Sequence, residues 1–517
     1  MRTRPPSAWY AAIAFAILAG AALRFQGIAT ESLWFDEVAQ VEWNKKPFLT
    51  FLSDRFSQVD PPLNEIIIWV YNNILRAAAP ESASSEFAIR LPVVIFGLCT
   101  IPIIAFAAFE AFGAFAGVLA AWLFATMPYA VRYGQEARMY SLTILLSSVA
   151  LYFLVRALKS HDSASRARCA IWFGIASAAA AYSHYYALLT LAAAFAATLL
   201  LWFRHREERL RPILRGELIG FAIAAPFIVA QGIYAASSGR GTRAWLSGFG
   251  DPTLETIYYS ARAYCIDLLP AGAAVQPADV VGAWFMNAAF ISLGALLLFS
   301  LLRKKAGDAG GLKLHLICML LLPPIVILAI SQKRQIFHPR YLLSILPALV
   351  LMWSCARPKW VAILLSAAPL AVGLAIAPQY RYILQKPDYR AAAESYIRDF
   401  REGDAVDVST IDHLPFLYYV KLLGSENSGA TAAVRNAQIR EHEAPQPNIL
   451  TFIARTPPAG SRIYEIDVMV PWSRLYMLDA LKYYKRRIQP ITAPEIHKLI
   501  FESKPFPAIR VWRVDSQ

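Results

Sequence analysis

Residues 89–109 read IRLPVVIFGLCTIPIIAFAAF and carry a single charged side chain, Arg90. A helix needs about 20 consecutive apolar residues to cross the hydrocarbon core of a bilayer, and this run is long enough. Ten other apolar runs fall at 9–27, 113–131, 139–157, 168–184, 185–203, 216–235, 282–302, 314–331, 341–356 and 359–377. The sequence therefore predicts an all-α polytopic membrane protein with about 11–13 transmembrane helices, eleven of them visible as separate runs.

The composition agrees with a membrane protein. Hydrophobic residues make up 57% of the 517 residues and charged residues 17%, whereas soluble globular chains have about 45–50% and 25%. An aromatic content of 13% excludes disorder, and the same composition excludes collagen, coiled coils and nucleic-acid-binding arrays. Five cysteines stand singly along the chain, so neither a disulfide framework nor a CxxC metal site is indicated.

The distribution of basic residues predicts the orientation, because cytoplasmic loops are rich in Lys and Arg. If the eleven runs alternate in direction, the basic clusters that flank them share one side. These are Arg2, Arg4, Arg156, Lys159, Arg166, Arg168, Arg204, Arg206, Arg209, Arg211, Arg215, Arg303, Lys304, Lys305, Arg357 and Lys359. The odd number of crossings then places the C-terminal region outside the cytoplasm.

Residues 62–79 are the segment on which this orientation depends. Asn64, Glu65, Asn72 and Asn73 interrupt its apolar residues, which favours an amphipathic helix lying at the outer interface. An ordinary crossing is the alternative, and it would place the later basic clusters outside.

The chain divides into two predicted domains. Residues 1–377 form the transmembrane domain with a first outer loop at 28–88, and residues 378–517 form a soluble α/β domain. In the second, a helix is expected at 389–400, strands at 405–410, 449–454, 462–468 and 508–514, and a basic amphipathic helix at 473–487. The basic helix either docks on anionic headgroups or on an acidic acceptor, or presents a solvated face.

Acidic residues of the first outer loop are the candidate catalytic groups. Asp36 and Glu37 follow Trp34 and Phe35, which would anchor at the interface, and Asp60 precedes a Pro-Pro turn. Such carboxylates can act as a general base on a hydroxyl or bind a hard cation. The alternative is helix capping, for which Asp is a good residue.

Three further outer segments offer side chains that could bind substrate. The stretch RYGQEARMYSL at 132–142 holds an acid, a guanidinium and a phenol, although an internal ion pair of Glu136 with Arg132 or Arg138 is the alternative. Basic residues at 332–341 lie on the predicted outer side, where the positive-inside tendency does not explain them. An anionic ligand is therefore expected there. The substrate- and phosphate-binding candidates are Glu136, Arg138, Tyr140, His184, Lys333, Arg334, His338 and Arg340.

The order of these motifs resembles a known family. WFDE in a long first outer loop, a Pro-Pro turn, RLP at 90–92, QEARMYSL, SHYYAL and HPRYLLSILPAL are similar to the GT-C membrane glycosyltransferases, in particular their RgtA/B/C/D-like branch. Lipid A aminoarabinose transferases and protein O-mannosyltransferases are related to that branch. One departure is that relatives usually have His before the Pro-Pro pair, where this chain has Asp60.

The resemblance implies a transferase in the bacterial inner membrane that works on the periplasmic side. Its donor would be a polyprenyl-phosphate sugar, and its acceptor lipid A, lipopolysaccharide core or another glycan. The acid of the first outer loop, Asp36 or Glu37, would act at the acceptor, with inversion at the anomeric carbon. No cofactor is certain; a divalent metal, if one is used, would bind Asp36, Glu37 and Asp60. A lipid-linked saccharide flippase or transporter is the alternative function, and an oligosaccharide ligase or O-antigen polymerase is a nearer competitor.

Overall fold

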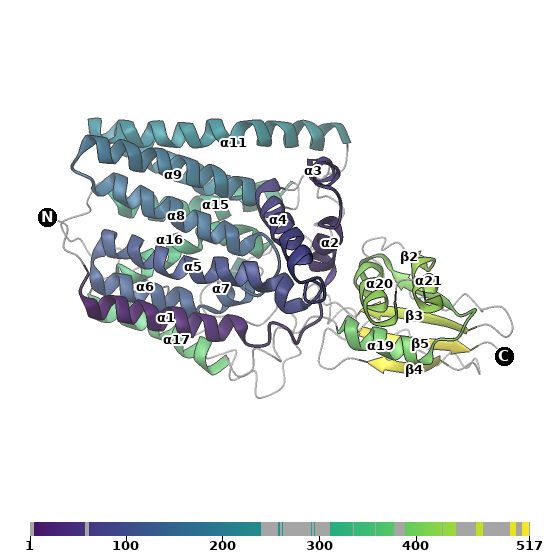
Figure 1. Ribbon diagram of the computed structural model, residues 1–517. Coiled ribbons are helices and arrows are strands. Elements are labelled where there is room, and N and C mark those ends of the chain that lie inside the picture. Colours follow the sequence, from purple (N-terminus) through teal and green to yellow (C-terminus); the bar gives the residue numbers. More distant parts are fainter. Residues whose placement is uncertain are drawn as a thin grey trace.

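The computed structural model describes residues 5–56, 61–238, 311–333, 336–356, 358–376, 388–425, 428–440, 462–468, 497–502 and 509–515, with a few isolated residues between 257 and 294. Most of the helices form one bundle, with α2, α3 and α4 lying across one end of it (Figure 1). We call this the α2–α4 end. The opposite end carries the α8–α9 and α10–α11 connections.

The bundle consists of apolar helices of different lengths that run side by side (Figure 1). They are α1 (Ser7–Phe25), α5 (Glu86–Phe112), α6 (Ala114–Thr126), α8 (Tyr140–Lys159), α9 (Ser163–Ser183), α10 (Ala187–His205), α11 (Arg211–Ser238), α15 (Leu312–Ser331), α16 (Leu346–Ser354) and α17 (Lys359–Ile376). Short 3₁₀ helices η1 (Glu208–Leu210) and η3 (Pro339–Ile345) precede α11 and α16. The chain is therefore a multi-pass membrane protein.

Fewer helices meet the criteria for crossing than the sequence predicts. Among the described residues, six are long and apolar enough, and they are Ser7–Phe25, Glu86–Phe112, Tyr140–Lys159, Ala187–His205, Glu208–Ala230 and Leu312–Ser331. The predicted run 113–131 is divided because Pro128 cannot continue the hydrogen bonding of α6, so α7 (Pro128–Tyr133) starts afresh. The predicted span 282–302 lies outside the described residues.

Small residues let α9 pack closely between its neighbours α8 and α11. A Cβ atom on Gly174 would lie 2.0 Å from the carbonyl oxygen of Gly216, and one on Gly216 would lie 2.1 Å from that of Ala170. Backbones approach this closely in membranes where Gly and Ala line the interface. Helix α9 is not among the six candidate spans, and it carries Arg166 and Arg168 near its start.

Helix α4 (Pro62–Ala78) lies across the end of the bundle rather than along it (Figure 1). It packs against α3 (Phe48–Phe56), α5 and α9, and it buries Asn64, Glu65, Ile68 and Asn72. It is not among the candidate spans. This arrangement agrees with the interfacial helix expected at 62–79.

The C-terminal region contains helices and a five-stranded sheet (Figure 1). The helices are α19 (Tyr389–Asp399), α20 (Thr410–Gly424) and α21 (Gly429–Arg435), and the strands are β1 (Ala405–Ser409), β2 (Gln438–Arg440), β3 (Arg462–Val468), β4 (His497–Glu502) and β5 (Ile509–Asp515). The order is β2-β1-β3-β5-β4. Strand β1 is parallel to β2 and β3, whereas β5 is antiparallel to β3 and β4.

The expected strands at 405–410, 462–468 and 508–514 correspond to β1, β3 and β5, and the expected helix at 389–400 to α19. The expected strand at 449–454 and the basic helix at 473–487 lie outside the described residues. The division into domains at residue 377 stays a prediction.

Candidate active site

Helix α2 (Phe35–Trp43) presents Asp36 at the α2–α4 end of the bundle. The helix starts after Trp34, whose backbone N–H donates to Glu37 Oε2 over 3.4 Å in a capping box. Asp36 stands in the first turn, where the partial positive charge of a helix N-terminus favours a carboxylate. Its side chain is 21% exposed, so it can be reached from solvent.

Glu37, the next residue, has a different setting. Its side chain is fully buried and forms a two-pronged ion pair with Arg90 of α5, at 2.9 Å from Nε to Oε1 and 2.8 Å from Nη2 to Oε2. The backbone N–H of Ala137 also donates to Oε1 over 2.9 Å. These contacts place Glu37 inside the protein. At the third position of the capped helix, the Glu37 carboxylate turns inward to Arg90. The expectation that Glu37 takes part in the chemistry beside Asp36 stays a prediction.

Arg90 also organises the chain that leads into α2. Its guanidinium donates to the backbone carbonyls of Ile28 and Glu31 through Nη1, over 2.8 and 2.9 Å, and to that of Ser32 through Nη2, over 3.1 Å. A buried guanidinium satisfied by a carboxylate and three carbonyls is a rigid anchor. It fixes the segment 28–37 against the start of α5.

Two guanidinium groups flank Asp36. Arg138, from the connection between α7 and α8, has its Nε 3.8 Å from Asp36 Oδ2, and Arg340, in η3, has its Nη1 3.9 Å from the same oxygen. Both distances are longer than a direct hydrogen bond. The arginine side chains are largely buried, at 12% and 10% exposed. Segments far apart in the sequence thus bring one carboxylate and two positive charges together.

Aromatic rings surround Arg340. Its guanidinium lies 5.7 Å from the ring centroids of Trp34, Tyr140 and Tyr341, within the range of cation–π attraction. His338 precedes η3, and its Nδ1 accepts from the backbone N–H of Arg340 over 3.2 Å. The rings and this cap hold the guanidinium in one orientation.

His184 packs into the same aromatic group. Its ring centroid lies 5.4 Å from that of Tyr341 and 5.8 Å from that of Tyr140. Burial, with the positive charges of Arg340 and Arg138, lowers the pKa of His184 to about 3. The imidazole is therefore neutral at physiological pH and adds no charge to a site that already holds two arginines.

The structure brings together most of the residues that the sequence analysis singled out. Asp36, Arg138, Tyr140, His184, His338 and Arg340 share the site described above. Glu136 is buried in the connection that supplies Arg138. Lys333 is exposed in the turn after α15, whereas Arg334 and Asp60 lie outside the described residues.

Two residues of the site were not singled out from the sequence. Tyr341 contacts His184, His338 and Arg340, and Arg90 holds Glu37. A charged residue inside an apolar run was the available signal for Arg90, because such residues are costly and are usually paired.

The carboxylates Asp36, Glu37 and Asp60 were the expected metal ligands. Within the described part of the chain, no three side chains of His, Cys, Asp or Glu lie close enough together to hold a metal ion. Glu37 is engaged with Arg90, and Asp60 is not described. The expected metal site therefore stays untested.

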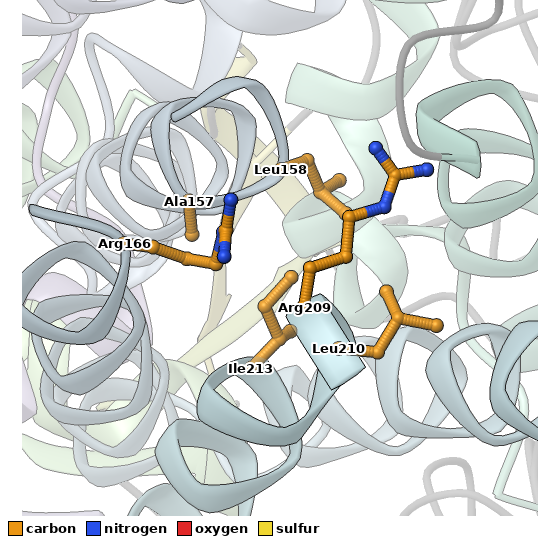
Figure 2. A pocket seen from close by; sticks show the side chains of 6 residues that line it. All are labelled: Ala157, Leu158, Arg166, Arg209, Leu210 and Ile213. Carbon is orange, nitrogen blue, oxygen red and sulfur yellow. The ribbon is translucent and has the colours of Figure 1, made fainter. Parts of the chain in front are cut away.

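A shallow depression with no room for a water molecule lies between the end of α8, the start of α9 and η1 (Figure 2). Arg166 and Arg209 contribute to its wall, together with Ala157, Leu158, Leu210 and Ile213. The lining contains no carboxylate and lies at the basic end of the bundle. We do not include it in the candidate site.

Comparisons with known proteins give one matching family model and several similar solved structures. A family model described as dolichyl-phosphate-mannose-protein mannosyltransferase matches residues 60–229. Comparison with curated protein sequences gives no match.

Among solved structures, ArnT from Cupriavidus metallidurans bound to undecaprenyl phosphate is similar, with a TM-score of 0.51 and 12% identity over 97% of each chain. The apo state of that protein gives the same TM-score and identity over 98% of each chain. The oligosaccharyltransferase AglB from Archaeoglobus fulgidus, in complex with an inhibitory peptide and a dolichol-phosphate, has 14% identity and a TM-score of 0.46, over 81% of this chain and 64% of its own. The family model matches about a third of the chain, and the likeness to ArnT shows that the two proteins share a fold.

Proposed function

We propose that this membrane glycosyltransferase of the GT-C fold moves a sugar from a polyprenyl-phosphate-linked donor to a cell-envelope acceptor. The α2–α4 end of the bundle is then the periplasmic end in a bacterial inner membrane. One observation carries the proposal. The partly exposed carboxylate of Asp36 lies within 4 Å of two largely buried guanidinium groups, so a base and a phosphate site occur together.

In the proposed reaction, an acceptor hydroxyl attacks the anomeric carbon of the donor sugar. The hydroxyl loses its proton to Asp36 while the bond from the anomeric carbon to the phosphate oxygen breaks. Polyprenyl phosphate leaves with one more negative charge than the phosphate carried in the donor. A single displacement of this kind inverts the configuration at the anomeric carbon.

Arg138 and Arg340 would stabilise that leaving phosphate. Charges fixed in advance where negative charge develops are often the largest contribution to catalysis, and here burial and aromatic contacts hold the guanidinium of Arg340 in place. Lys333 and Arg334 are proposed as further phosphate contacts, and Asp60 as a supporting acid. Glu37 is proposed to hold the loop through Arg90 rather than to touch substrate.

The comparisons support the donor class. The ArnT structure holds undecaprenyl phosphate, and the description of the matching family model names dolichyl-phosphate-mannose. Both molecules contain a polyprenyl-type phosphate. Lipid A, lipopolysaccharide core and other glycans are the acceptors that we propose to test, because the α2–α4 end faces the compartment that contains them under this orientation.

A transfer assay with the purified full-length protein tests the proposal. A panel of polyprenyl-phosphate sugars is mixed with lipid A and core acceptors, and the product linkage is determined by NMR. We expect transfer from at least one donor, with inverted configuration relative to that donor. A product that retains the donor configuration would rule out direct displacement, and binding of carrier lipid without transfer from any donor would favour a flippase.

A further inference from the structure

The C-terminal region contacts the loop that carries Asp36 through a set of polar groups, of which Ser32, Glu86 and Tyr419 are buried. Ser32 Oγ donates to Asp388 Oδ1 over 3.0 Å and accepts from the backbone N–H of Arg390 over 3.1 Å. The backbone N–H of Leu33 donates to the Tyr419 hydroxyl over 2.6 Å. Two consecutive residues just before α2 are therefore held by α20, by α19 and by the residue that caps α19.

Glu86, the first residue of α5, connects this contact to the membrane bundle. The Tyr419 hydroxyl donates to Glu86 Oε1 over 2.7 Å, and Arg390 forms an ion pair with the same carboxylate. The Arg390 guanidinium also lies 5.8 Å from the centroid of the Tyr419 ring. A phenol has one proton, so donation to Glu86 leaves the oxygen of Tyr419 to accept from Leu33.

Apolar burial adds to these hydrogen bonds. Leu33 and Val38, on either side of Asp36 in the sequence, belong to the same buried cluster as Phe416 and Tyr419 of α20. The side chains of Leu33, Val38 and Phe416 are apolar, and their removal from water stabilises the contact. The two ends of the first α2 turn are thus packed against the C-terminal region.

The opposite side of the same segment is held by Arg90. It donates to the backbone carbonyls of Ile28, Glu31 and Ser32, while the C-terminal region binds the Ser32 side chain and the Leu33 amide. The segment is fixed from both sides three residues before Asp36. Any displacement of Leu33 would shift the start of α2 relative to Arg138 and Arg340.

We propose that Tyr419 and Arg390 are positioning residues of the transferase, which act through Leu33 and Glu86 to hold Asp36 at its distance from the two site arginines. The C-terminal region is then a part of the catalytic apparatus rather than an independent appendage. This inference rests on the proposed function for its effect on turnover. The hold on Leu33 itself is a separate physical claim.

Two variants of the full-length protein test the inference. Tyr419→Phe removes one hydroxyl and leaves the ring in its cluster, and Arg390→Met removes a guanidinium that is 36% exposed and so is less critical for folding. Because a displacement of about 1 Å in an active site can cost about a hundredfold in rate, we expect kcat to fall about tenfold to a hundredfold. The donor KM is expected to stay nearly unchanged.

The matched control is Tyr396→Phe. The Tyr396 hydroxyl donates to the carbonyl of Ala430 over 3.2 Å, within the C-terminal region, and the side chain is fully buried in the same cluster as Tyr419. Its loss should lower stability in a similar way while leaving kcat near that of the wild type. An equal fall in kcat for both variants would show a general structural effect and overturn the inference.

A second readout does not depend on turnover. Hydrogen–deuterium exchange of a peptide covering residues 30–36 is measured without substrate, and it should be faster in Tyr419→Phe and Arg390→Met but not in Tyr396→Phe. Unchanged exchange in the first two variants would overturn the positioning role, as would faster exchange with undiminished kcat. If the donor assignment fails, no variant turns over and the exchange result alone decides whether the C-terminal region holds the segment.

Discussion

Replacing Glu37 by Gln should destabilise the loop that carries Asp36, because Glu37 is buried and pairs with Arg90. The substitution keeps the shape of the side chain and removes its charge. Arg90, only 2% exposed, would then be a buried guanidinium that has lost the carboxylate bonded to it. Its hydrogen bonds to the carbonyls of Ile28, Glu31 and Ser32 would remain.

The magnitude follows from these contacts. Breaking a buried ion pair by removing one charge costs about 3–5 kcal/mol. Because the amide oxygen of Gln can still accept one hydrogen bond and the three carbonyl contacts survive, we expect a loss of about 3 kcal/mol. Arg90→Met removes all five hydrogen bonds and leaves the Glu37 carboxylate buried, so it should cost about 5 kcal/mol or more.

The double variant provides the sharpest comparison. In Arg90→Met the unpaired carboxylate of Glu37 is a large part of the cost, so adding Glu37→Gln should restore stability by about 2 kcal/mol. The assay is unfolding of the detergent-solubilised protein, with Glu42→Gln as control. Glu42 of α2 pairs with exposed Lys45 in the turn after the helix, and the loss of this pair should cost less than about 1 kcal/mol. A double variant less stable than Arg90→Met would refute the role given to the ion pair.

Two other predictions concern the positive charge and the histidine of the site. Arg340→Lys should lower kcat about tenfold to a hundredfold with the protein still folded, because Lys lacks the planar group that stacks on the surrounding rings and binds phosphate in two places; kcat within twofold of the wild type would exclude Arg340 from the phosphate site. His184, with its pKa lowered to about 3, stays neutral in the folded protein while the unfolded chain binds a proton below its ordinary pKa of about 6.5. Stability is therefore greatest above pH 6.5 and should fall on acidification by about 1.4 kcal/mol per pH unit from this residue. Thermal unfolding between pH 7 and pH 5 should show a shallower slope in His184→Gln, and an identical slope would contradict the assignment.

Much of the membrane fold could be predicted from the sequence, because a crossing helix requires a long apolar run and such runs are visible one by one. Helix ends were harder to predict. Pro128 divides one apolar run into α6 and α7, and the Ala- and Ser-rich α9 packs through Gly174 rather than through large apolar side chains. These properties depend on neighbouring helices and not on local hydropathy.

The candidate site was predictable in its membership but not in its geometry. Alternating crossings placed the segments of Asp36, Arg138 and Arg340 on one side of the membrane, and the structure brings them within 4 Å. The sequence could not predict that Asp36 is partly exposed while Glu37 is buried, because either residue suits the start of a helix equally well. Capping turns Glu37 toward Arg90, which is a partner 53 residues away in the sequence.

The contact between the C-terminal region and the first loop could also not be predicted from the sequence. Leu33 and Tyr419 are 386 residues apart, and neither lies in a motif. Hydrogen bonds between such distant residues leave no periodic pattern. Only the folded chain shows that a tyrosine of α20 holds the start of α2.

The most direct test of the central claim compares Asp36→Asn with the wild-type protein in a single-turnover transfer assay, using one polyprenyl-phosphate sugar that the wild type accepts. Carrier-lipid binding is measured on the same preparations, and thermal unfolding confirms that both are folded. We predict that Asp36→Asn binds the carrier lipid and transfers no sugar above background, because the amide cannot take the proton of the acceptor hydroxyl. Transfer by Asp36→Asn at the wild-type rate would show that Asp36 is not the base.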